Sequence, residues 1–353
     1  MAVASNYLVG GNDEHGINPP TLGKRTPIMP YINRPIYENE FNYMAKNYFL
    51  IACLRCGFNI FDVKPELRDI SISSRVVRVN RANLSALVTF AYNAYLTTFN
   101  SSSGYQVFYS PTNSQVVKSR ALSYDVYDSL SENTTQRGRG VTTLDIGMLS
   151  SVNCPATLIE AGFMTNFQEA KNMLDPDYQK KIGEDACRGV CEFLDVNYVL
   201  PYTTTTSLPV LKQGDRGNKV KYLQYLLLIN GFSVGNIDGI FGAKTAEAVK
   251  KFQQQNGLTV DGIVGQNTYR HLLVLNPSSV VLRKGSKGSY VRYLQQKLLA
   301  KLYPLTVDND FGNITENAVL NFQSENNLVA DGIVGKNTWA KLIPIGGGRP
   351  LNN

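Results

Sequence analysis

Three segments of the chain contain residues that can carry out acid–base or metal chemistry. Glu160 follows the apolar run 155–159, so we expect it at the end of a strand, before a turn into a helix capped by Asn166. His15 is the only histidine among the first 270 residues, and histidine serves both as metal ligand and as general base. Taken singly, each has a structural interpretation, because a helix-entry carboxylate or a lone histidine needs no function.

The third segment, 36–42, opens the first long predicted helix and contains Glu38 and Glu40. A carboxylate at a helix N-terminus stabilises the helix by about 0.3–1 kcal/mol through the helix dipole. Position alone therefore gives neither residue a catalytic role.

Five cysteines all lie upstream of residue 200: Cys53, Cys56, Cys154, Cys187 and Cys191. The Cys-x-x-Cys pair resembles a redox or zinc pair, but it lies inside a predicted helix, and the last two cysteines are also helically spaced. We interpret all five as core thiols. Their odd number argues against a disulfide scaffold.

Residues 1–200 alternate strand-like and helix-like segments, which predicts an α/β domain with a central, mostly parallel sheet flanked by helices. The predicted strands are 6–10, 58–63, 84–90, 105–109 and 156–159, and the predicted helices lie near 39–56, 116–131, 167–174 and 176–194. Functional residues of such sheets gather at the carboxyl ends of the strands. His15 and Glu160 would both lie there.

The segment 201–208 has no apolar period and no charge, so it is interpreted as a linker. Beyond it the chain is basic, with 17 Lys and Arg against 9 Asp and Glu from residue 209 onward. An anionic polymer is the expected partner of this part: cell wall, nucleic acid or membrane surface. No apolar run approaches the roughly 20 residues of a membrane-spanning helix, and the first ten residues do not resemble a secretory signal.

The basic part is an internal repeat. Leu211, Gly214, Gly217 and Val220 recur 71 residues later as Leu282, Gly285, Gly288 and Val291, and the run 261–265 recurs at 331–335. Apolar residues at helical spacing predict three helices in each copy. We place the copies at 209–277 and 278–345.

Each copy closely resembles the peptidoglycan-binding type 1 domain, on the Leu-x-x-Gly-x-x-Gly opening, the Phe-Gly-x-x-Thr turn and the Asp-Gly-Ile-Val-Gly-x-x-Thr close. The resemblance implies cell-wall binding and selects the wall among the three anionic partners. The repeats lack the aromatic–basic interleaving of nucleic-acid-binding proteins.

Residues 6–195 resemble the zinc-dependent N-acetylmuramoyl-L-alanine amidases of the type 3 catalytic domain, which occur in autolysins and endolysins. The matching segments are 15–16, 23–27, 38–42, 75–80, 93–94, 138–141 and 155–166. The resemblance implies that His15 and Glu38 hold Zn²⁺ and that Glu160 performs acid–base catalysis. Glu38 is preferred to Glu40 on its spacing to Asn42. Substrate contacts are expected at three positions: Arg75, Asn80 and Asn93.

Ala91 departs from the family pattern. The segment 89–94 aligns with Ser-x-His-x-Asn-Ala, so Ala91 stands where the resemblance places the second histidine ligand. Either the natural protein has lost this ligand, or His was replaced by Ala to give an inactive enzyme. The persistence of Glu38, Glu160 and Asn93 favours replacement. We expect weak or absent zinc binding and little amidase activity.

The sequence thus predicts a peptidoglycan hydrolase that cleaves the amide between N-acetylmuramic acid and L-alanine in a Gram-positive wall. The competing hypothesis is a non-catalytic wall-binding protein with a degenerate amidase scaffold. Synthesis in the cytoplasm followed by release through a holin-type lesion or by lysis is expected, as for an endolysin.

Overall fold

The computed structural model describes residues 1–16, 24–132 and 134–343. The chain divides into two compact units between Leu200 and Pro201. Gly23 of the predicted motif 23–27, and residues 344 and 345 of the predicted second repeat, lie outside the described residues. Within the described ranges, no helix has the length and apolar character needed to span a membrane.

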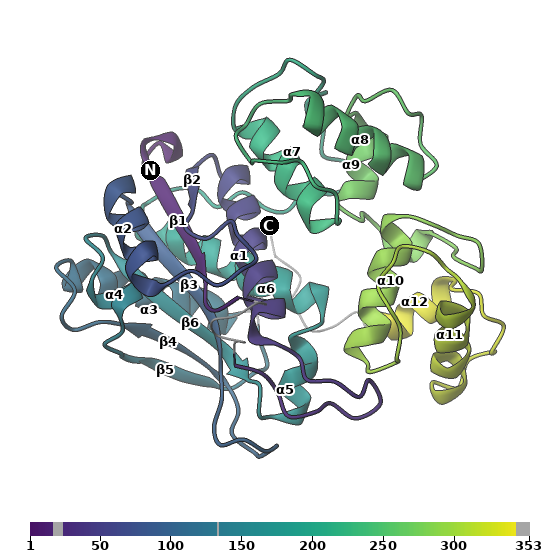
Figure 1. The fold of residues 1–353 in the computed structure, drawn as a ribbon, viewed down its shortest axis with the longest axis horizontal. Helices are drawn as coiled ribbons and strands as arrows, with labels where there is room; N and C mark the ends of the chain where they lie inside the picture. The colour runs from purple at the N-terminus through teal and green to yellow at the C-terminus, as the bar shows by residue number, and fades with distance from the viewer. Residues whose placement is uncertain (17–23, 133, 344–353) are drawn as a thin grey trace. The chain divides into compact units, whose positions relative to one another are not determined.

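The first unit is built on one six-stranded sheet in the order β2-β1-β3-β6-β4-β5 (Figure 1). All strand pairs are parallel except β4 with β6. The strands are β1 (Leu8–Asp13), β2 (Asn59–Asp62), β3 (Ala86–Asn93), β4 (Tyr105–Tyr109), β5 (Gly138–Thr143) and β6 (Ala156–Phe163). The predicted α/β class with a mostly parallel sheet is confirmed.

Helices cover both faces of this sheet. On one face, α1 (Glu38–Arg55) and α3 (Val116–Glu132) both pack against α6 (Pro176–Phe193). On the other face, α2 (Ile72–Ala82) and α4 (Gly147–Ser150) close a core with β3 and β6. The short elements are η1 (Ala4–Asn6) and α5 (Phe167–Asn172).

Besides the short η1 and α4, two longer elements of this unit were not predicted. Strand β5 contains two glycines and an arginine and is largely exposed, so it lacks the apolar alternation of a strand and depends on pairing with β4. Helix α2 buries only Arg75 and Val79, although Ile72, Val76 and Val79 have the i, i+4, i+7 spacing of an amphipathic helix, so this signal was present in the sequence and was missed.

The expected turn after Glu160 is wrong. Strand β6 continues to Phe163 because β3 also extends, and Asn93 pairs with Phe163 across a register shift. Glu160 therefore lies inside a strand rather than at its end. Asn166 does cap α5, because its Oδ1 accepts from the backbone N–H groups of Gln168 and Glu169.

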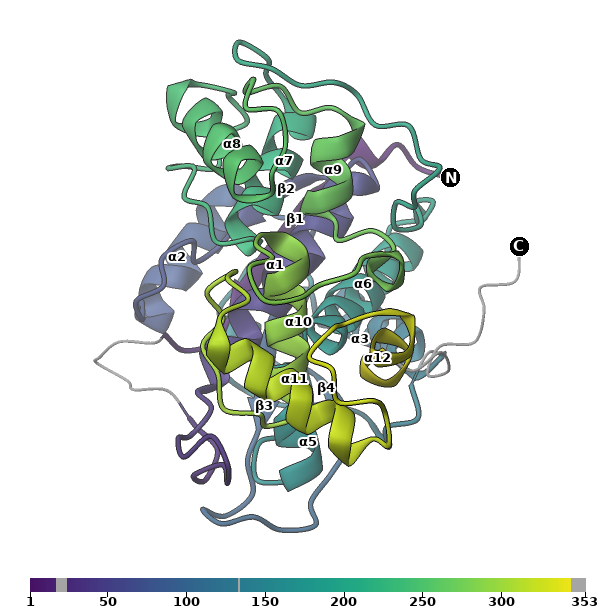
Figure 2. The ribbon, with the colours of Figure 1, turned by 90° about the vertical axis from the view of Figure 1, so that its right-hand side faces the viewer.

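The second unit contains two copies of a three-helix module (Figure 2), which confirms the predicted repeat. The first has α7 (Asn218–Ile229), α8 (Ala243–Gln255) and α9 (Gln266–Leu272). After η2 (Pro277–Ser279), the second has α10 (Ser289–Ala300), α11 (Asn313–Glu325) and α12 (Lys336–Leu342). Leu211 and Leu282 each pair with the valine of the closing motif, Val264 and Val334 respectively.

A buried glutamine explains the conserved spacing within each module. Gln253 donates to Asp261 Oδ1 at 2.8 Å and accepts from Gly262 N at 2.9 Å. Gln323 makes the same pair of bonds to Asp331 and Gly332, each at 2.9 Å. Gly262 has φ +74°, which favours glycine at this turn. The repeated Asp-Gly motif is therefore a loop fixed to the middle helix of its module.

A buried ionic cluster at the end of β1 connects this strand to α1 and to the segment after β2. Asp13 lies between Lys46 of α1 and Lys64, with Oδ1 2.8 Å from the first ammonium and Oδ2 2.7 Å from the second. All three residues are fully buried. Burial raises the pKa of Asp13, but the two ammonium groups outweigh this and hold it below the usual value. The ionised carboxylate is thus a structural requirement.

We expect Asp13→Asn to lower the free energy of unfolding by about 3 kcal/mol, since it leaves buried Lys64 without its carboxylate and buried Lys46 with Asp62 alone. The stabilisation by the Asp13 carboxylate is fully present above the pKa of an unfolded aspartate, about 3.9. It is lost as the pH falls through the lower pKa that Asp13 has in the folded protein. Urea denaturation at pH 7 and pH 3 measures both. The control is Glu66→Gln, which removes a partly exposed pair with Arg78 and should cost less than about 1 kcal/mol. Equal losses in the two variants would contradict the buried-anchor assignment.

Candidate metal centre and active site

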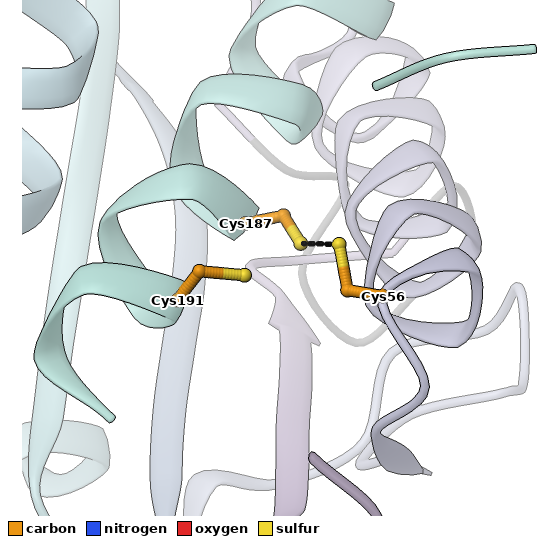
Figure 3. Close-up of side chains that lie close together, drawn as sticks. All are labelled: Cys56, Cys187 and Cys191. Atoms are coloured by element: carbon orange, nitrogen blue, oxygen red, sulfur yellow. Dashed lines mark hydrogen bonds between the residues drawn. The ribbon is translucent and has the colours of Figure 1, made fainter. Parts of the chain in front are cut away.

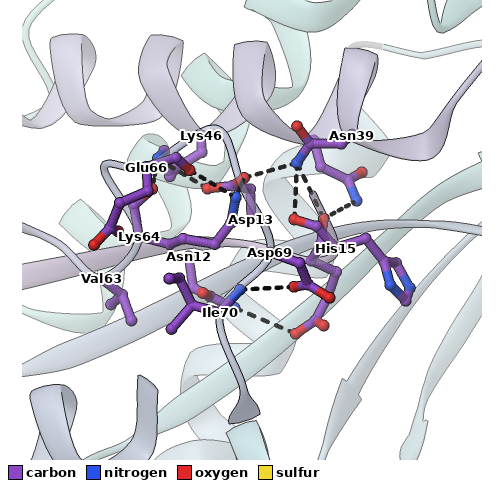
Figure 4. A network of polar contacts seen from close by, with 12 residues as sticks. Asn12, Asp13, His15, Asn39, Lys46, Val63, Lys64, Glu66, Asp69 and Ile70 are labelled. Atoms are coloured by element: carbon purple, nitrogen blue, oxygen red, sulfur yellow. Dashed lines mark hydrogen bonds and ion pairs between the residues drawn. The ribbon is translucent and has the colours of Figure 1, made fainter. Parts of the chain in front are cut away.

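His15 lies two residues beyond β1 in a conformation that its neighbours hold in place. Its φ is +60°, a region that non-glycine residues seldom adopt. Asn39 donates through Nδ2 to the carbonyls of Glu14 and His15, at 3.3 and 3.0 Å. Asn42 donates to the same Glu14 carbonyl at 3.2 Å. The first turn of α1 therefore fixes the loop that carries the imidazole (Figure 4).

The residue after His15 must be a glycine, Gly16, because the backbone of a neighbouring loop lies against it. A Cβ at this position would meet the backbone nitrogen of Asp69 at 2.3 Å, so no side chain fits without moving the 68–69 backbone. The His15 loop thus packs directly on a neighbouring loop. The His15 side chain itself is 27% exposed.

The structure separates the roles of Glu38 and Glu40. Glu40 Oε1 accepts from the backbone N–H of Tyr37 at 2.9 Å and pairs with Arg34 at 2.7 Å, so this residue caps α1. Glu38 is 2% exposed and turns toward the histidine, with Oε2 3.4 Å from His15 Nε2. Glu38, rather than Glu40, therefore lies beside the predicted metal ligand.

Glu38 is oriented through its other oxygen. Its Oε1 accepts from Asn42 Nδ2 at 3.0 Å and from the backbone N–H of Tyr92 at 2.9 Å. Among the described residues, its buried Oε2 has no hydrogen-bond partner. One oxygen is thus held by α1 and β3, and the other is directed at the imidazole without a donor of its own.

Ala91 and Glu160 lie side by side on neighbouring strands. They are register partners of β3 and β6, and paired residues of adjacent strands direct their side chains to the same face. Ala91 also precedes Tyr92, whose N–H holds Glu38. The structure therefore brings position 91 and Glu160 together and connects both to the Glu38 and His15 pair.

The carboxyl of Glu160 is strongly perturbed. Its Oε2 is buried, with no hydrogen-bond partner in the described ranges. Burial raises its pKa well above the usual value, the nearby carboxylates Glu38 and Glu14 raise it further, and Lys24 opposes them. Such a group favours holding a proton, which suits a residue that must receive one and pass it on.

The three predicted substrate contacts have protein partners. Arg75 is 2% exposed and donates to the Asp13 carbonyl at 2.9 Å and to Asp69 at 2.7 Å. Asn80 bridges α2 to the loop 151–153. Asn93 accepts from the Ala94 N–H at the end of β3. These contacts give each side chain a structural role, and substrate contact stays a prediction.

Sequence reasoning missed the residues that support the centre. Asn39 and Asn42 hold the histidine loop and Glu38, and Glu14 lies beside them with Oε2 3.8 Å from Arg75. Burial raises the pKa of Glu14, although Arg75 and His15 lower it in part. The one available signal was the polar spacing of α1, because Asn42 lies four residues after Glu38 and three after Asn39, spacings that place it beside both on the helix surface.

Two known families match parts of this chain. Residues 27–192 match the N-acetylmuramoyl-L-alanine amidase family, and residues 216–272 and 287–342 each match the peptidoglycan binding domain. The chain therefore carries an N-acetylmuramoyl-L-alanine amidase domain followed by two peptidoglycan-binding domains. The matched segment contains Glu38, Ala91 and Glu160, whereas His15 precedes it within the same structural unit.

Curated relatives align with only part of this chain. Amidase CwlL of Bacillus licheniformis is 35% identical over 161 residues, which is 38% of this chain and 45% of that protein. Amidase CwlM of Mycobacterium tuberculosis is 38% identical over 122 residues, 31% of this chain and 30% of that protein. The chain thus spans less than half the length of these curated relatives.

An N-acetylmuramoyl-L-alanine amidase from Clostridium difficile aligns with a TM-score of 0.47 and 23% identity, covering 54% of this chain and 97% of that one.

The amidase family is generally zinc-dependent, so the ligand set can be tested against zinc geometry. Zinc bonds of about 2.0–2.1 Å in a tetrahedron place neighbouring ligand atoms about 3.3 Å apart. The His15 Nε2 to Glu38 Oε2 separation of 3.4 Å fits this edge, and the orphaned Glu38 oxygen is a suitable ligand. Ala91 offers no ligand atom. The site therefore fits zinc with two protein ligands rather than three.

We expect Glu160→Gln to flatten the pH dependence of stability when a chelator is present. Because the folded pKa of Glu160 is raised, the folded protein retains a proton that the unfolded chain releases. The free energy of unfolding should therefore fall as pH rises from about 4.3, the pKa of an unfolded glutamate, toward the folded value. Glutamine removes this decline.

Thermal unfolding between pH 4 and pH 8 measures the slope, and Glu132→Gln, at an exposed position on α3, is the control. Identical slopes for Glu160→Gln and the unmutated chain would show that Glu160 does not retain a proton on folding.

Proposed function

We propose that this protein belongs to a lineage of peptidoglycan hydrolases that cleave the amide between N-acetylmuramic acid and L-alanine. The convergence of His15, Glu38, position 91 and Glu160, drawn from four separate elements, supports the proposal. A general base beside a metal-binding pair is the arrangement that amide hydrolysis requires, because water is a weak nucleophile at neutral pH. The peptidoglycan-binding domains supply affinity for the same polymer.

The amidase residues divide the chemistry between them. Zinc, when bound, lowers the pKa of water toward about 7 and polarises the scissile carbonyl. His15 and Glu38 would hold it, and Asn42 with the Tyr92 N–H fixes the other oxygen of Glu38, Oε1, so that Oε2 stays directed at the metal position. Glu160 takes the proton of the attacking water and transfers it to the leaving L-alanine nitrogen. Its raised pKa matches that transfer.

Ala91 impairs this arrangement in the present chain. A methyl group cannot replace an imidazole nitrogen, so only two of the three protein ligands of a typical catalytic zinc site remain. We propose that zinc binds weakly and that hydrolysis is slow or absent. The second candidate function, a wall-binding protein with an inactive amidase domain, is favoured by this one substitution.

We expect Ala91→His to gain both zinc affinity and lytic activity, since it restores a third ligand beside Glu160. Loss of a group that only supports a ligand lowers metal affinity roughly 10–100-fold. Because residue 91 would bind the metal directly, the gain in zinc affinity should be larger than this. Calorimetric titration with zinc and clearing of purified Gram-positive walls measure the two effects.

Matched controls come from the two carboxylates of α1. In the Ala91→His background, Glu38→Gln should abolish both gains, whereas Glu40→Gln should keep them and cost about 1 kcal/mol of stability as a lost cap. If Ala91→His gains neither metal nor lysis, the enzyme proposal fails and the non-catalytic function stands.

We further propose that the two peptidoglycan-binding domains act together on the wall. Two linked modules raise residence by effective concentration, and the basic charge of this part suits an anionic polymer.

Deleting residues 280–353 should therefore reduce retention on purified walls by at least about tenfold, as loss of the second module removes the avidity. Wall pelleting measures retention, and the melting of the 1–200 unit, followed separately, should not change. Unchanged retention would contradict joint action of the modules.

A further inference from the structure

Four of the five cysteines meet between two helices that are far apart in the sequence. Cys56 directly follows α1, whereas Cys187 and Cys191 lie one turn apart on α6. The sulfur atoms of these three residues, Cys56, Cys187 and Cys191, all lie within 4.8 Å of one another (Figure 3). Cys53, one turn before Cys56, lies beside Cys187. All four are buried.

The spacing of the sulfurs fits a metal–thiolate centre. Zinc–sulfur bonds of about 2.3 Å in a tetrahedron place neighbouring sulfurs about 3.8 Å apart. The Cys56 and Cys187 sulfurs are 3.9 Å apart. A disulfide instead requires a separation of about 2.05 Å.

The surroundings of the cluster also suit thiolate ligands. The backbone N–H of Val199 donates to Cys56 Sγ at 3.3 Å, and such outer-shell bonds stabilise negative charge on a ligand. The Arg55 guanidinium lies close enough to favour the Cys56 thiolate, and it is fixed by its pair with Glu184. The cluster therefore has both a hydrogen-bond donor and a cation beside its outermost sulfur.

Cys154 shows what an ordinary core thiol looks like in the same domain. It lies in the hydrophobic cluster on the other face of the sheet, with Ala156 and Leu158. Burial raises the pKa of its thiol to about 12, and no other cysteine lies beside it in the described cluster. The four-cysteine group is thus distinct from ordinary thiol packing.

We propose that Cys56, Cys187 and Cys191 form a structural site for a thiophilic divalent cation such as Zn²⁺, with Cys53 one helical turn away beside Cys187. The site is separate from the amidase centre, because Glu38 opens α1 and Cys56 follows its end. Eighteen residues of helix place them about 27 Å apart. The cation would join α1, α6 and the segment ending at Val199, directly before the second unit begins.

The test measures metal in the full chain after equilibrium dialysis against zinc under reducing conditions. The His15→Ala background removes any contribution of the amidase centre. We expect about one zinc per chain in this background, the same amount after Cys154→Ser, and a loss of at least about tenfold in affinity after Cys187→Ser with Cys191→Ser.

Cobalt substitution keeps the test decisive if the serine variants fail to fold. Co²⁺ added to the His15→Ala chain should produce a sulfur-to-metal charge-transfer band, which zinc then removes. Five reactive thiols with no bound metal would overturn the proposal in favour of a thiol core. A mass lower by about two hydrogens with no metal would overturn it in favour of a disulfide.

Discussion

The position of the amidase centre depends on a fully buried charge at the end of β1. Asp13 lies between Lys46 of α1 and Lys64 after β2, with Asn39 donating to the same carboxylate at 2.9 Å (Figure 4). Burying such charges is costly, and leaving any one unpaired costs more. The pairing therefore fixes β1 against α1. As a result, the loop with His15 and the first turn with Glu38 have one relative placement.

From this anchor, the site is built by short polar connections rather than by apolar packing. Asn39 holds the loop, Asn42 holds one oxygen of Glu38, and β3 holds the same oxygen through a backbone N–H. The left-handed conformation of His15 and the buried, unpartnered oxygens of Glu38 and Glu160 are costs that the fold bears at this place. Costs of this kind gather where a protein keeps a site ready for a ligand.

The sequence predicted elements whose pattern is local and missed those that depend on distant partners. The helix through Phe49 is a long segment rich in apolar residues and buried on most sides, the strand ending at Tyr109 is a short aromatic run between turn residues, and the Asp-Gly loops of the repeats follow one motif. Strand β5 and the length of β6 depend on neighbouring strands. The contact between Cys56 and Cys187 joins residues 131 positions apart in the sequence. Helical spacing alone could show only that the two cysteines of each helix lie on the same side of that helix. The role of Glu40 as a cap also required its contact with Arg34.

The central claim is that His15, Glu38 and position 91 surround one metal position, with Glu160 beside it. Anomalous diffraction at the zinc edge from crystals of the Ala91→His chain tests this most directly. The account predicts one peak within about 2.0–2.2 Å of His15 Nε2, Glu38 Oε2 and the new imidazole, with Glu160 outside bonding distance. A peak bonded to Glu160 or Glu40, or none among these residues, would contradict it.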